Sequence, residues 1–140
     1  MTNTIPAKYH DLLTTRAFAN LATIMDDGAP QVTPVWFDLE GDLGGNLGGY
    51  YVRINSAQGR VKDRNMRARP YVALSIVDPH NPYRYLQIRG PVVEITTEGA
   101  DAHIDALAEK YTGAGRRFNH QPGEVRVIYK IKPEHVHASG

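Results

Sequence analysis

The chain has 140 residues, with 16 lysines and arginines, 15 aspartates and glutamates, and no cysteine. This length suits a single domain over residues 1–140. The net charge of +1 creates no global attraction for nucleic acid or membranes. Because there is no cysteine, disulfide and thiolate chemistry are excluded. Residues 1–20 contain several charges and no apolar run, and no window approaches the roughly 20 apolar residues of a membrane span. We therefore expect a cytoplasmic protein without a signal peptide.

The first third of the chain predicts a short helix followed by a β-hairpin. Apolar residues in 5–15 recur at i, i+4, i+7 and i+8, which is typical of an amphipathic helix. Residues 18–25 and 30–38 have strand composition, and residues 26–28, Asp-Asp-Gly, are a hairpin signal between them. Pro34 lacks a backbone N–H, so we expect its position at a sheet edge or a bulge, which can re-aim its neighbours.

Residues 39–49 contain five glycines. They resemble no phosphate-binding loop, because they lack its lysine and its following helix, and we interpret them as a hairpin tip. Residues 50–55 alternate aromatic and β-branched residues with polar ones and predict a strand. The strand breaks at Asn55-Ser56, where short polar side chains suit a turn, and a helix is expected over about 59–69.

The start of this second helix is the chain's most informative feature. Arg60 and Lys62 lie in the expected first turn, where cations oppose the helix dipole. A phosphate bound at the helix N-terminus, with a donor from Ser56, would compensate for them. Arg64 and Arg67 share the Arg60 helix face at i, i+4 and i+7, and we expect them to be solvated. The corner therefore predicts an anion site.

The second half of the chain completes a mainly β pattern with a few short helices. Its expected elements are strands over 71–77, 83–95 with an interruption at Gly90-Pro91, and 124–131, and a helix over 99–112. Altogether the chain predicts about six antiparallel strands linked mainly by hairpins, which suits a closed or split β-barrel.

Two other site classes are disfavoured by the sequence. The six histidines show no zinc-ligand spacing, and we expect surface histidines and no metal site. Residues 60–69 carry five cations and one aspartate, but one helix without an aromatic platform is a weak nucleic-acid footprint. We expect no nucleic-acid partner.

Four segments carry a family resemblance. Residues 21–36, 55–65, 78–90 and 99–111 resemble, in order, segments of the pyridoxamine 5′-phosphate oxidase-like split-barrel superfamily. The match covers about residues 10–137, and it looks closest to the flavin/deazaflavin oxidoreductases that use coenzyme F420, an 8-hydroxy-5-deazaflavin. The resemblance implies a six-stranded antiparallel split β-barrel of the FMN-binding type. It also implies a homodimer with cofactor grooves between the subunits.

The resemblance also assigns residues to the cofactor. Arg60 and Lys62 would hold its phosphate, and the other expected cofactor-binding positions are Gln31, Thr33, Pro34, Trp36, Asn55, Ser56, Gln58, Val61, Tyr83 and Tyr85. No residue stands out as an obligatory acid or base, which is compatible with hydride transfer because the cofactor carries that chemistry. The substrate would be an electron-poor small molecule such as a quinone, an enone or a tetrapyrrole.

Alternatives stay open on the cofactor and on catalysis. The anionic lactyl-oligoglutamate tail of F420 would give Arg53, Arg64 and Arg67 a partner, whereas FMN would leave these arginines without one. The alternatives to an F420-dependent oxidoreductase are an FMN-binding flavoprotein of the same fold and a non-catalytic protein that binds a cofactor or haem. A second phosphate-binding set for pyridoxamine phosphate is not assignable, so that oxidase activity is not expected. A haem-binding protein would need an axial ligand for the haem iron at the groove. No histidine that could serve as this ligand lies in the second or third expected strand.

Overall fold

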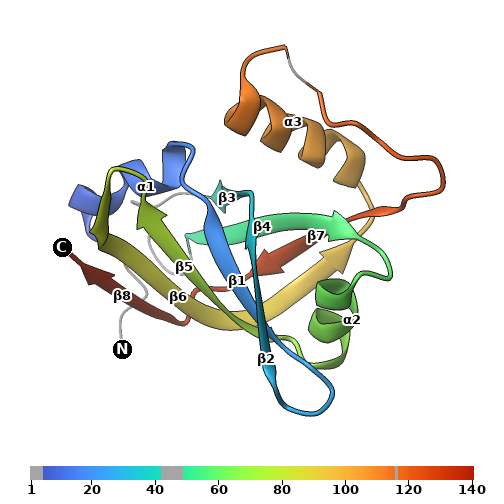
Figure 1. The fold of residues 1–140 in the computed structure, drawn as a ribbon, viewed down its shortest axis with the longest axis horizontal. Helices are drawn as coiled ribbons and strands as arrows, with labels where there is room; N and C mark the ends of the chain where they lie inside the picture. Colours follow the sequence, from blue (N-terminus) through green and yellow to red (C-terminus); the bar gives the residue numbers. More distant parts are fainter. Residues whose placement is uncertain (1–4, 42–48, 116) are drawn as a thin grey trace.

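The computed structural model describes residues 5–41, 49–115 and 117–140. Its strands are β1 (Ala19–Ile24), β2 (Pro30–Val35), β3 (Phe37–Gly41), β4 (Tyr50–Ala57), β5 (Tyr71–Asp78), β6 (Asn81–Thr96), β7 (Arg126–Ile131) and β8 (His135–Ser139). Its helices are the 3-10 turn η1 (Ala7–Tyr9), α1 (Asp11–Thr14), α2 (Val61–Ala68) and α3 (Ala100–Thr112). Figure 1 shows the strands wrapped around one another, with α2 at one end of the barrel and α3 outside it.

The strands form an antiparallel split β-barrel in the order β2-β1-β5-β6-β7-β4-β3, and β8 pairs with β6. The long strand β6 serves both halves of the barrel, because it pairs with β5 and β8 along its first part and with β7 after Gly90-Pro91. Gly90 is required there, since a Cβ atom would lie 1.8 Å from the Lys132 carbonyl oxygen. The predicted interruption is therefore a change of partner within one strand.

The core is formed by the inward-facing residues of the alternating strands. In β4, Val52 and Ile54 are fully buried, and in β6 Leu86 and Ile88 are fully buried. The apolar stripe of residues 5–15 packs onto the same core. That segment is a 3-10 turn and a four-residue helix rather than the single predicted helix.

The described residues contain eight strands where the sequence predicts six, although the fold class is the predicted one. The predicted strand 30–38 is divided at Trp36: β2 pairs with β1, and β3 pairs with β4. Trp36 thus crosses between the two ends of the strand order. The other additional strand is β8, which follows Pro133 and pairs with β6.

Two hairpin expectations have different outcomes. Pro34 lies in β2, at one end of the strand order, so the expectation of an edge position is confirmed. The glycine-rich tip expected over 39–49 lies largely outside the described residues, which omit 42–48. The strands on either side of it do form the predicted hairpin, with Gly41 opposite Tyr50.

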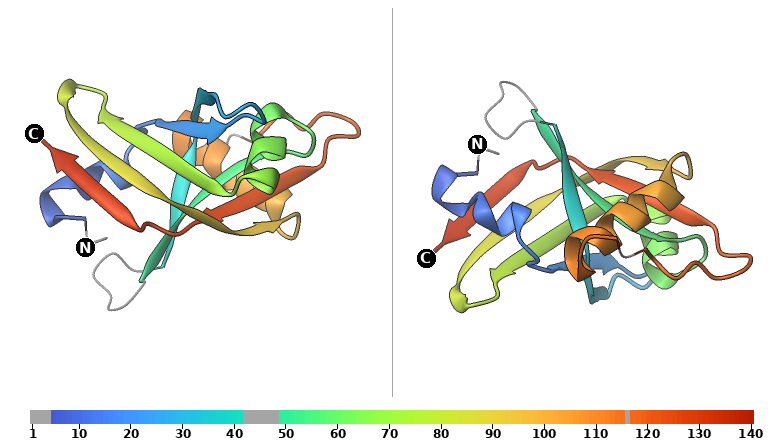
Figure 2. Two further views of the ribbon diagram at one scale, coloured as in Figure 1. Left: turned by 90° about the horizontal axis from the view of Figure 1, so that it is seen from below. Right: turned by 90° about the horizontal axis from the view of Figure 1, so that it is seen from above.

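Helix α3 creates the surface on which the site is built. Figures 1 and 2 show it lying across the outside of the barrel, and it contacts β7 and β4. The buried side chains Ile104, Leu107 and Tyr111 form a second, smaller apolar cluster with Trp36 and Phe118. The groove described below lies beside this cluster.

Candidate functional site: a groove between helices α2 and α3

The corner between β4 and α2 is held by a buried carboxylate. Asp63, in the first turn of α2, accepts hydrogen bonds from the Gly59 N–H at 2.9 Å, from the Tyr129 hydroxyl and from Arg67 Nε at 3.0 Å. Burial by itself would raise the pKa of the Asp63 carboxyl, but these hydrogen bonds outweigh burial and lower it. Gly59 adopts a φ of +91°, which glycine tolerates. Arg60 precedes the helix as its N-cap residue rather than lying in its first turn.

A groove of about 210 Å³ opens beside this corner. One part of its wall is aromatic and aliphatic and the other part is cationic and polar. It is lined by Phe18, Pro34, Val35, Trp36, Asn55, Ser56, Arg60, Lys62, Ile104, Leu107, Phe118 and Arg126. Such a wall suits a ligand that combines a flat apolar ring with an anionic group.

The cationic part of the groove contains more positive than negative charge. Arg60 Nη2 lies 3.1 Å from Glu124 Oε2, and Arg126 Nη1 lies 3.1 Å from Glu124 Oε1, so the two arginines share one carboxylate. Within the described residues, Lys62 has no acidic partner. Burial, followed by the nearby charges of Arg60 and Arg126, lowers the pKa of the Lys62 ammonium. An anion bound here would reverse that effect.

Two buried hydroxyl groups near the groove are unsatisfied. Ser56 Oγ, which lines the groove, and Thr33 Oγ1 on β2 have no hydrogen-bond partner among the described residues. Leaving a buried polar atom unpaired costs about 1–3 kcal/mol. Together with the unpaired Lys62, the Ser56 hydroxyl offers donors that fit a phosphate, and the first N–H groups of α2 have no partner inside the helix, as at any helix start.

The aromatic part of the wall is rigid. Trp36 stacks on Tyr111 with ring centroids 5.3 Å apart and an angle of 9° between the rings. The Tyr111 hydroxyl donates to the Ala17 carbonyl at 2.8 Å, which fixes its ring. On the other side, the Arg126 guanidinium lies 4.7 Å from the Phe118 ring centroid. These contacts hold flat surfaces at the groove without closing it.

The structure brings half of the sequence-predicted cofactor residues to the groove. Those that line it are Pro34, Trp36, Asn55, Ser56, Arg60 and Lys62. Val61 begins α2 between two of them, and Gln58 is an exposed turn residue beside them. The Asn55 amide makes three hydrogen bonds within the chain.

The remaining predicted residues do not line the groove. Gln31 and Thr33 alternate with Pro34 along β2, and Gln31 Oε1 accepts from Thr23 Oγ1 at 3.1 Å. Tyr83 is 82% exposed, and Tyr85 lies opposite Val77 at the β5–β6 end of the barrel. Figure 1 shows this end beside α1, away from α2.

The sequence alone did not indicate Phe18, Phe118 and Arg126 as groove residues, nor Glu124 as the carboxylate that pairs with two of the groove's arginines. Phe118 is the lone large apolar residue of a polar loop, which was an available signal. Arg126 lies in an alternating strand and looked like an outward residue, yet its side chain is 4% exposed. Its place opposite Ala57 follows from the β4–β7 register, which only the fold supplies.

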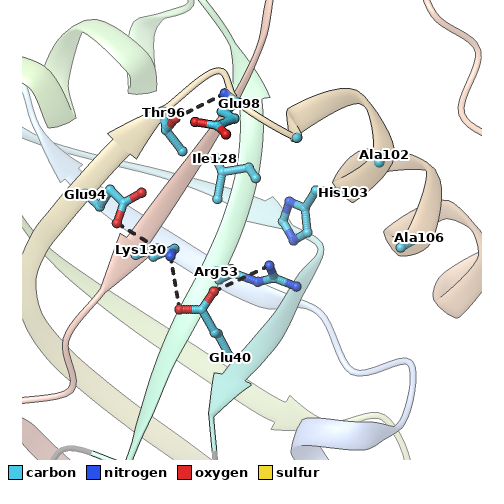
Figure 3. A pocket seen from close by; sticks show the side chains of 11 residues that line it. Glu40, Arg53, Glu94, Thr96, Glu98, Ala102, His103, Ala106, Ile128 and Lys130 are labelled. Carbon is cyan, nitrogen blue, oxygen red and sulfur yellow. Dashed lines mark hydrogen bonds and ion pairs between the residues drawn. The ribbon is translucent and has the colours of Figure 1, made fainter.

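A second group of charges lies on the outer face of the sheet and is fully paired. Asp38, Arg53, Lys130 and Glu94 occupy directly opposed positions on β3, β4, β7 and β6. Glu40 bridges the two cations, lying 3.8 Å from Arg53 and 3.0 Å from Lys130. Figure 3 shows these contacts, and we call this row of five residues the outer charge ladder.

The ladder corrects one prediction about the arginines. FMN would not leave Arg53 and Arg67 without partners, because Arg53 makes two hydrogen bonds to Asp38 at 3.0 and 2.7 Å and Arg67 binds Asp63. Arg64 donates to the Gly59 carbonyl. Most of the cations among residues 53–67 therefore already have hydrogen-bond or ion-pair partners within the chain. Among the described residues, Lys62 is the exception.

The histidines also differ from the expectation in one place. His103 is not a surface residue: it is 5% exposed, because it lies on the face of α3 that packs against the sheet. His135 and His137 lie on β8. The residues that the structure describes contain no group of three or more potential metal ligands. Among them there is also no helix long and apolar enough to cross a membrane.

Comparison with known families and structures agrees with the geometry. The family model described as pyridoxamine 5′-phosphate oxidase matches residues 5–140. A solved structure called F420 reductase is 34% identical, with 95% of this chain and 98% of that chain covered and a TM-score of 0.79. No curated protein matches the chain significantly.

More distant solved structures share the fold. A conserved hypothetical protein from Mycobacterium tuberculosis is 20% identical, covers 99% of this chain and 88% of its own, and has a TM-score of 0.72. General stress protein 26 from Bacillus anthracis is 13% identical, with coverages of 94% and 91% and a TM-score of 0.67. At these identities the likeness concerns the fold alone.

Proposed function

Because the chain belongs to the pyridoxamine 5′-phosphate oxidase family, we propose that it is an oxidoreductase that binds a phosphorylated flavin-type cofactor in the groove between α2 and α3. The observation that carries the proposal is the half-buried Lys62, which has no acidic partner in the described residues, next to the unsatisfied Ser56 hydroxyl. A phosphate would provide the missing charge and the missing acceptor.

The residues of the chain divide the work of binding. Lys62 and Arg60 would hold the phosphate with the first N–H groups of α2, while Trp36 and Phe118 would orient the ring system and exclude water from it. A bound flavin or deazaflavin supplies hydride transfer. The groove presents three cations and the Ser56 hydroxyl but no carboxylate or histidine among its lining residues, so the chain's part is orientation and electrostatics. An electron-poor small molecule stacked against the ring would be the substrate.

Among cofactors of this type we propose coenzyme F420, with FMN as the alternative. The F420 reductase structure, at 34% identity over nearly the whole chain, supports this choice. Support from the chain's own charges is limited, because most arginines near the groove already have partners. Arg64 is exposed and has no acidic partner among the described residues. It is therefore the cation best placed to attract the anionic tail of F420.

We further propose that a second copy of the chain completes the site. The groove of about 210 Å³ is smaller than the roughly 300–1,000 Å³ of ordinary cofactor sites, so one chain holds only part of the cofactor. Val32 is 63% exposed on the edge strand β2, and Phe18 is 49% exposed at the groove. A partner covering this edge would bury both side chains and could satisfy Thr33 Oγ1.

Equilibrium binding of F420, FMN and FAD to the cofactor-free protein tests the proposal. We expect F420 to bind more tightly than FMN, and both to bind better than their forms without phosphate. Sedimentation at micromolar concentration should show a dimer. If FMN binds more tightly than F420, the cofactor assignment is wrong. If no phosphorylated form binds, the proposed function is wrong.

A non-catalytic binding protein would pass the binding test and fail a turnover test. Reduced F420 should be oxidised by a quinone or an enone in the presence of the protein, and the rate should fall in Lys62→Ala in step with the loss of bound cofactor. Tight binding without turnover for a panel of such acceptors would favour the cofactor-carrier alternative.

A further inference from the structure

We propose that His103 is a positioning residue for the cofactor groove: through the Asn55 amide it holds the Arg126 guanidinium toward the bound phosphorylated cofactor. The inference rests on the proposed function for its ligand. His103 itself does not line the groove, and it lies on the opposite side of Asn55, in the wall of a separate cavity of about 470 Å³ under α3. Its effect on the cofactor must therefore pass through another residue.

The Asn55 side chain has one possible orientation. Asn55 Nδ2 lies 2.9 Å from the Ala100 carbonyl oxygen and 3.1 Å from His103 Nδ1, and Asn55 Oδ1 lies 2.9 Å from Arg126 Nε. A rotated amide would place an oxygen against the Ala100 oxygen and an NH₂ group against the arginine donor. Both contacts would be repulsive, so the orientation in which Asn55 Oδ1 accepts from Arg126 is required.

This orientation also determines the tautomer of His103. Since Asn55 Nδ2 is a donor, His103 Nδ1 must be the acceptor, and the ring proton must be on Nε2. His103 Nε2 lies 3.0 Å from Asp38 Oδ1, which accepts that proton's hydrogen bond. Asp38 is held in turn by two hydrogen bonds from Arg53. Figure 3 shows His103 pointing from α3 toward the sheet, near Arg53 of the outer charge ladder.

Arg126 is the end of this series of contacts that faces the cofactor. Its side chain is 4% exposed. Arg126 Nε donates to Asn55 Oδ1, and Arg126 Nη1 donates to Glu124 Oε1. In the described part of the chain, Nη2 makes no hydrogen bond, and the residue lines the groove. A buried guanidinium that lost the Asn55 acceptor would turn toward another one, and Glu124 is adjacent. The groove would then lose one of its three cations.

The variant that tests the contacts from His103 through Asn55 to Arg126 is His103→Leu, with His103→Asn as its matched control. Leucine removes one of the two acceptors of Asn55 Nδ2, so that only the Ala100 carbonyl still holds the NH₂ group. The asparagine oxygen occupies the position of Nδ1 on the same Cγ atom and preserves both contacts. We expect the Kd for F420, or for FMN if that is the tighter ligand, to rise about tenfold in His103→Leu. A change of this size corresponds to the loss of one net hydrogen bond. The Kd should return to within about threefold of the wild type in His103→Asn.

A double-mutant cycle with Arg126→Gln separates positioning from general damage to the fold. If His103 acts through Arg126, His103→Leu should raise the Kd in the wild-type background and have no further effect in the Arg126→Gln background. Equal increases in both backgrounds, or equal Kd values for wild type and His103→Leu, would overturn the inference.

Nitrogen-15 NMR of the cofactor-free protein provides a readout that does not depend on binding. The wild type should show a neutral His103 with its proton on Nε2, and an Arg126 Nε–H resonance protected from exchange. That resonance should remain in His103→Asn and disappear in His103→Leu. If no flavin-type cofactor binds, the proposed function fails, and this resonance alone decides the inference. A protected Arg126 Nε–H in His103→Leu would refute it.

Discussion

The groove and the outer charge ladder lie on opposite sides of Asn55 and use charge in opposite ways. In the ladder, the cations Arg53 and Lys130 face each other on adjacent strands, and the carboxylates of Asp38, Glu40 and Glu94 neutralise them. In the groove, Arg60 and Arg126 share the one carboxylate of Glu124, and the third cation, Lys62, has no acidic partner among the described residues. The ladder therefore has an excess of negative charge before any ligand arrives, and the groove has an excess of positive charge.

A count of basic residues in the sequence does not locate an anion site. Arg53, Arg64 and Arg67 make the corner look strongly basic in sequence, yet two of them are neutralised within the chain. Lys62 lies in the same stretch, and among the described residues the lack of a partner distinguishes it. Substitutions in the ladder should mainly change the free energy of unfolding, and substitutions in the groove should mainly change cofactor affinity.

The largest expected effect is on the carboxylate that builds the groove's corner. Asp63→Asn should lower the free energy of unfolding at pH 7 by about 2–4 kcal/mol, because it leaves buried donors facing a weaker acceptor. Hydrogen bonds lower the folded-state pKa of Asp63 below its unfolded value of about 4. The stability from the ionised group is thus present above about pH 4 and lost as the pH falls through the folded pKa.

Urea denaturation at several pH values measures this effect. The difference between wild type and Asp63→Asn should be full at pH 5–7 and should narrow as the pH is lowered below about 4. A difference that stays constant to pH 2 would show that Asp63 does not contribute through its charge.

A matched pair of lysines tests the comparison directly. Lys62→Ala should weaken binding of the phosphorylated cofactor by about 1.5–3 kcal/mol, since it removes a charge-assisted phosphate contact, and Arg60→Ala should have a similar effect. Lys130→Ala, in the ladder, should leave the Kd within about twofold and lower the free energy of unfolding by up to about 1 kcal/mol. Calorimetry and denaturation on the same samples give both quantities. Equal loss of affinity in Lys62→Ala and Lys130→Ala would remove the distinction between the two regions.

Ser56→Ala should have opposite effects on stability and on binding. Removing a buried hydroxyl without a partner should raise the free energy of unfolding of the cofactor-free protein by about 1 kcal/mol. The same change should raise the Kd of the cofactor several-fold, because the phosphate loses a donor. Thermal unfolding with and without cofactor measures both. A destabilised cofactor-free variant would show that the hydroxyl has a structural partner.

The smallest expected effect concerns the tail of F420. Arg64→Glu should raise the Kd for F420 a few-fold at low salt, and the difference should disappear near 0.5 M salt, because exposed charges are screened. FMN, which has no such tail, should respond by less than twofold. Arg67 is unsuited to this test, since it binds the buried Asp63. If shortening the tail has no effect on affinity at low salt, tail recognition by surface charge is wrong.

Local patterns in the sequence determined most of the elements of this protein. The alternation of apolar and polar residues in β4, β6 and β7, the hairpin signal at 26–28 and the helix over 99–112 are properties of neighbouring residues, so they could be predicted without the fold. The strand-to-helix corner with Arg60 and Lys62 was predictable for the same reason. The division of the strand at Trp36 was not, because it depends on which partner each half of the strand meets.

Only the tertiary structure decided which charged side chains are free to bind a ligand. Arg53 is paired because the register of β3 and β4 places Asp38 opposite it, and Arg126 reaches the groove because β7 lies beside β4. His103 is buried because α3 packs against that sheet. Ion pairing and desolvation depend on atoms that are far apart in the chain, so residue types and spacings alone do not reveal them.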